Sequence, residues 1–107
     1  MTERIAGMLG LARRAGKLTA GFDAVKDLLV SHKVNTVFLA TDISPKTEKE
    51  LRFAASDAVL FLTIGMTKDE IGHAIGNQKP VGAVTTEDKG FLRSMQNALR
   101  PNEEDAI

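Results

Sequence analysis

The sequence of 107 residues contains no cysteine and has no net excess of charge of either sign. The lack of cysteine excludes disulfides, thiolate zinc sites and cysteine nucleophiles, and it fits the reducing environment of the cytoplasm. No apolar run reaches membrane-spanning length, and Arg4, Arg13 and Arg14 interrupt the apolar residues that a signal peptide would need. We therefore expect a cytoplasmic protein with no membrane contact.

The charge is distributed unevenly along the chain, although a total of zero does not indicate a strongly basic nucleic-acid binder. Residues 1–33 contain six basic and three acidic residues, so the remainder carries the compensating negative charge. Glu103, Glu104 and Asp105 near the C-terminus account for that negative charge. Any basic surface should therefore belong to the N-terminal third of the chain.

Length and composition predict one domain over residues 1–100, followed by a frayed acidic tail over residues 101–107. Helical spacing of apolar residues and helix-capping residues predict helices at Thr2–Ala15, Gly21–Ser31, Pro45–Ala55, Thr67–Gly76 and Asp88–Leu99. Strands are expected at Thr36–Ala40, Ala58–Leu62 and Val81–Thr85, with a short strand at residues 17–19. The first two apolar runs are typical of strands that are buried on both faces. This alternation predicts an α/β fold, a three-layer α/β/α sandwich around a small mixed sheet.

The segment from Arg13 to Lys26 is the most informative part of the chain. Arg13, Arg14 and Lys17 lie in a short connection punctuated by glycine, and a helix is expected to begin at Gly21. A helix N-terminus has unpaired N–H groups and a partial positive charge, so basic residues beside it suit a polyanion such as RNA. A solvated turn is an equally good interpretation of these residues.

A second loop of interest precedes the helix expected at Thr67. Ile64 and Met66 flank Gly65 in this loop. These apolar side chains are suited to packing against splayed nucleotides, while Thr67 meets a phosphate. The alternative, which the sequence slightly favours, is that Ile64 ends a strand and Met66 packs onto the following helix as a hydrophobic staple.

Asp42 is the best candidate for a catalytic residue, because it follows a buried strand of the expected α/β fold. A structural turn residue is the favoured interpretation, since Asp-Ile-Ser-Pro is typical of turns and no second carboxylate lies nearby in sequence. His32 and His73 have no metal-ligating partner at a suitable spacing. The sequence also lacks a phosphate-binding loop, a dinucleotide-binding fingerprint and a serine-nucleophile motif. We therefore predict no catalytic residue, no metal site and no small-molecule substrate.

Several motifs occur in an informative order and spacing. They are Gly16–Lys17 with Gly21, Thr36–Pro45, Ile71–Gly76 and Val81–Val84. Together they resemble the kink-turn RNA-binding family, which includes the archaeal large-subunit ribosomal protein "seven-Ae" and the eukaryotic "thirty-e" protein. The opening Leu9–Lys17 is most similar to the bacterial branch. The resemblance covers about residues 4–99 and implies an α/β/α sandwich, structured RNA such as ribosomal RNA as the ligand, the ribosome or translation machinery as a partner, and no cofactor.

The recognition motif of that family, Gly-x-Asn-Glu-x-x-Lys, lies at the start of the second helix. An ungapped register matches Gly21 but places Asp23, Ala24 and Asp27 at the Asn, Glu and Lys positions. A shift by one residue pairs Asp23 with Glu and Lys26 with Lys, but it loses the glycine and needs a gap. We prefer the ungapped register. In either register the motif is incomplete, and Asp27 would repel phosphates.

The first functional hypothesis is a non-catalytic RNA-binding protein of the ribosomal kink-turn-binding type. Its predicted RNA-binding residues are Arg13, Arg14, Lys17, Gly21, Phe22, Asp23, Lys26, Ile64, Gly65, Met66, Thr67 and Lys68. We expect the Gly21 helix start and the Ile64–Lys68 loop to be neighbours, bordered by the three basic residues of the first segment. Phe22 is expected either to meet bases or to pack inside the second helix.

Two other classes of function fit the same sequence. One is a protein-interaction module that kept the fold and lost kink-turn recognition, which the neutral charge and the incomplete motif support. The other is a small enzyme or nucleotide-binding domain centred on Asp42, which nothing else in the sequence supports.

Overall fold

A computed structural model describes residues 2–99 of the chain, and the expected acidic tail at residues 101–107 lies outside the described residues. The helices are α1 (Thr2–Arg14), α2 (Phe22–Val30), α3 (Pro45–Ala54), α4 (Lys68–Ala74) and α5 (Lys89–Leu99). The strands are β1 (Thr19–Ala20), β2 (Thr36–Leu39), β3 (Leu60–Thr63) and β4 (Ala83–Thr85). Each expected element is present, although the strands are shorter than expected or displaced by one or two residues.

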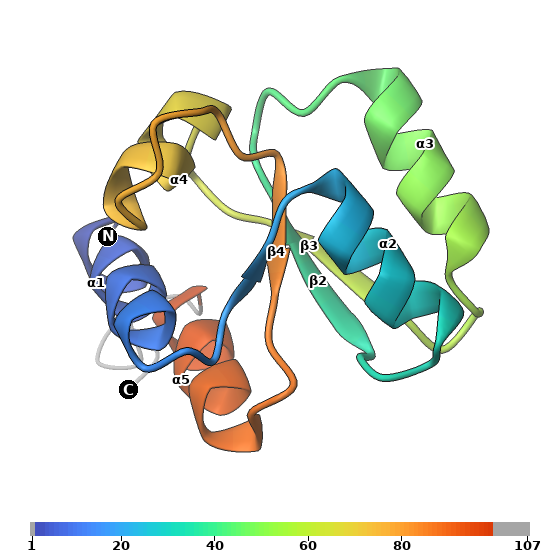
Figure 1. The fold of residues 1–107 in the computed structure, drawn as a ribbon, viewed down its shortest axis with the longest axis horizontal. Coiled ribbons are helices and arrows are strands. Elements are labelled where there is room, and N and C mark those ends of the chain that lie inside the picture. The colour runs from blue at the N-terminus through green and yellow to red at the C-terminus, as the bar shows by residue number, and fades with distance from the viewer. Residues whose placement is uncertain (1, 100–107) are drawn as a thin grey trace, which may run out of the picture.

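The strands form a single mixed sheet in the order β1-β4-β2-β3. Helices α2 and α3 cover one face of this sheet, and α1, α4 and α5 cover the other (Figure 1). The predicted three-layer α/β/α sandwich is therefore confirmed.

The strand directions determine which connections lie at each end of the sheet. β2 is parallel to β3, whereas β4 is antiparallel to both β1 and β2. The carboxyl ends of β1, β2 and β3 therefore meet at one end of the sheet, which we call the carboxyl end. The connections that lead into these three strands meet at the opposite end, which we call the amino end.

Strand β2 is buried along its whole length, as its apolar sequence predicts. Phe38 packs into a cluster with residues of α1, α4 and α5, including Leu9 and Met95. Val37 and Leu39 point to the other face and pack into the cluster below α2 and α3. Both hydrophobic cores therefore share this strand.

The prediction that the run Ala58–Leu62 is a strand buried on both faces is wrong. The strand begins at Leu60, whose side chain is 50% exposed, and Phe61 and Leu62 are only partly buried. The reason is strand order, because β3 lies at the edge of the sheet with β2 on one side only. A short apolar run gives no information about strand order.

Candidate functional site

Short backbone connections hold the two predicted binding segments at the carboxyl end of the sheet. The N–H of Gly21 donates to the carbonyl of Ala83 at 2.9 Å, and the N–H of Val81 donates to the carbonyl of Lys68 at 3.0 Å. Residues 81–83 thus join the start of α2 to the start of α4. The Gly21 helix start and the Ile64–Lys68 loop, expected to be neighbours, are linked indirectly through this segment.

The start of α2 is open to an anion. Gly21 precedes the helix with φ of 100°, and no side chain caps this end. The N–H groups of Phe22, Asp23 and Ala24 have no hydrogen bond to another described residue. A Cβ atom at Gly21 would meet nothing within 4 Å, so a ligand has space beside the backbone. These N–H groups and the positive end of the helix dipole can bind a phosphate.

The start of α4 is closed by its own side chains. The Thr67 hydroxyl accepts a hydrogen bond from the N–H of Glu70 at 3.1 Å, and the Glu70 carboxylate accepts one from the N–H of Thr67 at 2.9 Å. Asp42 Oδ1 accepts a hydrogen bond from the N–H of Lys68 at 2.7 Å. Carboxylates thus already accept from the N–H groups of Thr67 and Lys68 and would repel an anion, which disfavours the phosphate contact expected at Thr67.

Asp42 lies in a turn, as the sequence predicts, but its carboxylate makes a long-range contact that turn chemistry does not predict. It lies in the exposed turn between β2 and α3, and its carboxylate fastens this turn to α4. The carbonyl of Met66 strengthens the same junction by accepting a hydrogen bond from the N–H of Thr41 at 2.9 Å. Asp42 thus positions the carboxyl end of the sheet.

The apolar residues of the second loop belong to the core. Ile64 and Met66 are 0% and 4% exposed, and both pack into the cluster that contains Ile71. Met66 and Ile71 occupy the positions of a hydrophobic staple around the Thr67 cap. The prediction that their side chains meet RNA is therefore wrong, while Gly65 remains exposed and Lys68 partly exposed.

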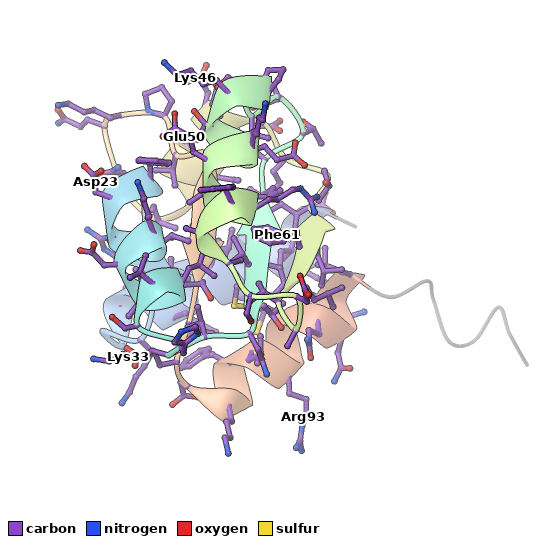
Figure 2. The ribbon with its side chains drawn as sticks, turned by 90° about the vertical axis from the view of Figure 1, so that its right-hand side faces the viewer. Asp23, Lys33, Lys46, Glu50, Phe61 and Arg93 are labelled. Atoms are coloured by element: carbon purple, nitrogen blue, oxygen red, sulfur yellow. The ribbon has the colours of Figure 1, made fainter. Side chains whose placement is uncertain are left out.

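The outer surface of α2 presents the recognition-motif positions of the ungapped register. Asp23, Ala24 and Asp27 are all exposed, and Asp23 lies at the upper end of α2 in Figure 2. In contrast, the Phe22 side chain is half-buried and packs against the cluster below α2 and α3. The Lys26 ammonium lies 5.5 Å from the centre of the Phe22 ring. The geometry favours the ungapped register, since the shifted register would place a recognition residue at half-buried Phe22.

The structure places Arg13, Arg14 and Lys17 away from this site. Arg13 and Arg14 end α1, and Lys17 precedes β1, so all three lie towards the amino end of the sheet. The prediction that they border the Gly21 helix start is wrong. Lys17 and Gly21 are close in sequence, but the extended chain between them crosses the sheet from one end to the other.

The loop 77–80 is a part of the carboxyl end that sequence reasoning missed. All four of its residues are exposed, and Lys79 adds a cation. The loop follows α4, passes over Gly72 of that helix and leads into Val81 (Figure 1). A polar stretch between Gly76 and Pro80 signals such a loop in the sequence, but it does not reveal which helix lies beside it.

Residues 2–99 contain no group of three or more His, Asp or Glu side chains that could hold a metal ion. None of the helices in this range is both long and apolar enough to cross a membrane. The candidate site rests on the uncapped start of α2 at the carboxyl end of the sheet.

The sequence of this chain matches a family of ribosomal and RNA-binding proteins, in agreement with the sandwich fold and the open α2 start. Residues 3–96 match the Ribosomal protein L7Ae/L30e/S12e/Gadd45 family, and the chain belongs to this family. Among individual relatives, the chain is similar to the RNA-binding protein YlxQ of Enterococcus faecium. The two sequences are 27% identical over 97 residues, which cover 91% of this chain and 92% of the relative.

Solved structures show the same fold. A protein of unknown function from Bacillus halodurans superposes with a TM-score of 0.77 at 27% identity, over 90% of this chain and 96% of that one. The 15.5kD RNA binding protein of Giardia lamblia superposes with a TM-score of 0.72 at 16% identity, over 92% of this chain and 83% of that one. The second similarity establishes the fold alone.

Proposed function

We propose that this protein is a non-catalytic RNA-binding protein of the kink-turn-binding type, which works in the cytoplasm with the ribosome or translation machinery. The single observation that carries the proposal is the uncapped, partly exposed start of α2 at the carboxyl end of the sheet. The family match and the printed function of the Enterococcus faecium relative support RNA as the ligand.

In this proposal RNA is bound by the α2 start and the residues around it. The unpaired N–H groups after Gly21 hold a phosphate, and Asp23 accepts hydrogen bonds from base edges. Lys26, Lys68 and Lys79, which come from α2, α4 and the loop 77–80, supply positive charge at this end of the sheet. Structured RNA fits this arrangement better than a free nucleotide, because the donors and cations come from separate segments of the chain.

The test restores the recognition motif in the ungapped register. Ala24→Glu with Asp27→Lys supplies one base-reading carboxylate and replaces an anion by a cation. We expect affinity for a kink-turn duplex to rise by roughly tenfold or more. Affinity for a plain duplex of equal length should change much less. Gel shifts of wild type and variant with both RNAs measure the selectivity.

A matched control uses the same residue types elsewhere on the surface. Asp57 and Ala58 are both exposed in the connection between α3 and β3. Asp57→Lys with Ala58→Glu changes the net charge equally but at the amino end of the sheet, so any gain in affinity should be equal for the two RNAs and kink-turn selectivity should be unchanged. The proposal fails if wild type binds no RNA at low salt. It also fails if the restored variant and the control have equal selectivity.

A protein-interaction module that lost kink-turn recognition is the second candidate. The observation in its favour is that the exposed face of α2 carries Asp23 and Asp27 but no cation. Such a module would bind neither the kink-turn duplex nor bulk ribosomal RNA at low salt. That result separates the two functions.

A further inference from the structure

Six exposed cations gather towards the amino end of the sheet, opposite the candidate RNA site. We call this surface the basic end, and it consists of Arg13, Arg14, Lys17, Lys33, Lys89 and Arg93. Lys33 and Arg93 lie at the lower end of the molecule in Figure 2, whereas Asp23 and Lys46 lie at the upper end. The basic residues come from α1, α5 and two connections, so the fold assembles them.

Two of these cations occupy equivalent positions after successive helices. Gly16 ends α1 with φ of 72°, and the N–H of Lys17 then donates to the carbonyl of Ala12 at 2.8 Å. His32 follows α2 with φ of 58°, and the N–H of Lys33 donates to the carbonyl of Leu28 at 2.9 Å. Both are Schellman motifs, which fix the backbone of each lysine just beyond a helix.

Hydrogen bonds from the end of β4 hold the connection that carries Lys17 beside the start of β2, which follows the connection that carries Lys33. The Thr86 hydroxyl donates to the carbonyl of Lys17, and the Thr85 hydroxyl donates to the carbonyl of Thr36 at 2.6 Å. β4 lies between β1 and β2, so the connections that carry Lys17 and Lys33 are separated by two strand spacings, roughly 10 Å. Phosphates of one RNA segment can reach both lysines.

The positive charge of the basic end is not neutralised locally. Within residues 2–99, none of its six side chains has a hydrogen bond or an ion pair to another described residue. The carboxylates at this end are Asp57, Glu87 and Asp88, and Asp88 Oδ1 already accepts a hydrogen bond from the N–H of Phe91 at 2.9 Å. The carboxyl end, in contrast, has three carboxylates around the start of α4, those of Asp42, Asp69 and Glu70.

We propose that the basic end is a second RNA-binding surface, which holds the phosphate backbone of a separate RNA segment. The inference rests on the proposed function for the class of ligand. Lysine and arginine contacts to phosphates bind without reading sequence. Because the sheet separates this surface from the α2 start, one protein molecule bridges two RNA segments.

The test measures whether one protein holds two RNAs. Biotinylated fragments of ribosomal RNA are immobilised, the protein is added, and retention of fluorescent ribosomal RNA fragments is recorded, with light scattering to exclude aggregates. Lys17→Gln with Lys33→Gln removes two cations of the basic end. Lys46→Gln with Lys49→Gln removes two exposed cations from α3, outside this surface, and serves as the charge-matched control.

We expect wild type and control to retain the fluorescent RNA, whereas Lys17→Gln with Lys33→Gln loses it and still binds the immobilised RNA. The slope of log affinity against log salt should also fall by about two units in this variant. If the variant and the control retain the fluorescent RNA equally, the inference is overturned and the proposed function stands. The same holds if one wild-type molecule binds only one RNA. A wild type that binds neither RNA overturns both. Equal thermal midpoints confirm that the variants are folded.

Discussion

A Cβ atom at Gly72 would lie 2.4 Å from the carbonyl oxygen of Lys79, a distance that real side chains do not reach. Gly72 is buried in α4, and the loop 77–80 passes directly over it. The N–H of Asn77 also donates to the carbonyl of Gly72 at 2.8 Å. This one small residue therefore sets the position of a loop at the carboxyl end of the sheet.

Gly72→Ala should lower the free energy of unfolding by about 2–3 kcal/mol, because a backbone carbonyl must move to admit the methyl group. The matched control is Gly7→Ala in α1, where an added Cβ meets nothing within 4 Å. That change should stabilise the protein by up to about 1 kcal/mol through helix propensity. Urea denaturation measures both, and the same sign of effect for both variants would contradict the packing at Gly72.

Asp42 provides a second test at the level of one side chain. Asp42→Ala leaves the N–H of Lys68 without its partner, so we expect a loss of about 1 kcal/mol in the free energy of unfolding. Asp42→Asn retains an acceptor oxygen and should lose less. RNA affinity should stay within a few fold for both variants. Loss of a measurable enzymatic activity in Asp42→Asn would instead make Asp42 catalytic.

At the scale of secondary-structure elements, local signals predict helices well and strand environment poorly. The serine cap of α3 and the capping box of α4 are both present, since such motifs act within one turn of helix. The exposure of β3 was not predictable, because it depends on which strand lies beside it. Lys17 was expected beside Gly21 because the two are close in sequence. The segment between them is extended, however, so a few residues are enough to reach the other end of the sheet.

In the candidate site, too, features that depend on local sequence were predicted and features that depend on long-range contacts were not. The start of α2 at Gly21 was identified from the sequence, since glycine is one of the residues found at the N-cap position before an amphipathic run. The closing of the α4 start by Asp42 was not identified, because these residues lie 26 positions apart. Burial of Ile64 and Met66 likewise follows from packing against other elements.

The end of α2 offers a prediction about an element boundary. His32 has φ of 58°, a left-handed conformation that a Cβ atom disfavours and glycine adopts freely, as Gly16 does after α1. His32→Gly should therefore raise the free energy of unfolding by about 1 kcal/mol. His73→Gly inside α4 is the control and should lower it by a similar amount. Thermal denaturation that shows destabilisation by both variants would contradict the Schellman end.

At the scale of the whole molecule, the sheet separates two cores and joins them through β2. Phe38 belongs to the core of α1, α4 and α5, while Val37 and Leu39 belong to the core of α2 and α3. Loss of packing on one side should therefore disturb the strand that supports the other side. We expect the sandwich to unfold as one cooperative unit.

Two phenylalanines test this cooperativity with identical chemistry. Phe38 is 0% exposed and Phe53 is 92% exposed, so Phe38→Ala should lower the free energy of unfolding by about 3–5 kcal/mol and Phe53→Ala by less than about 0.5 kcal/mol. In Phe38→Ala, amide hydrogen exchange should accelerate equally in α5 and in α2, although α2 packs on the other face. Faster exchange in α5 with unchanged protection at Leu29 would show instead that the two faces open independently. In that case β2 would not couple the α2 face, where we place the first RNA contact, to the α1 and α5 side of the fold.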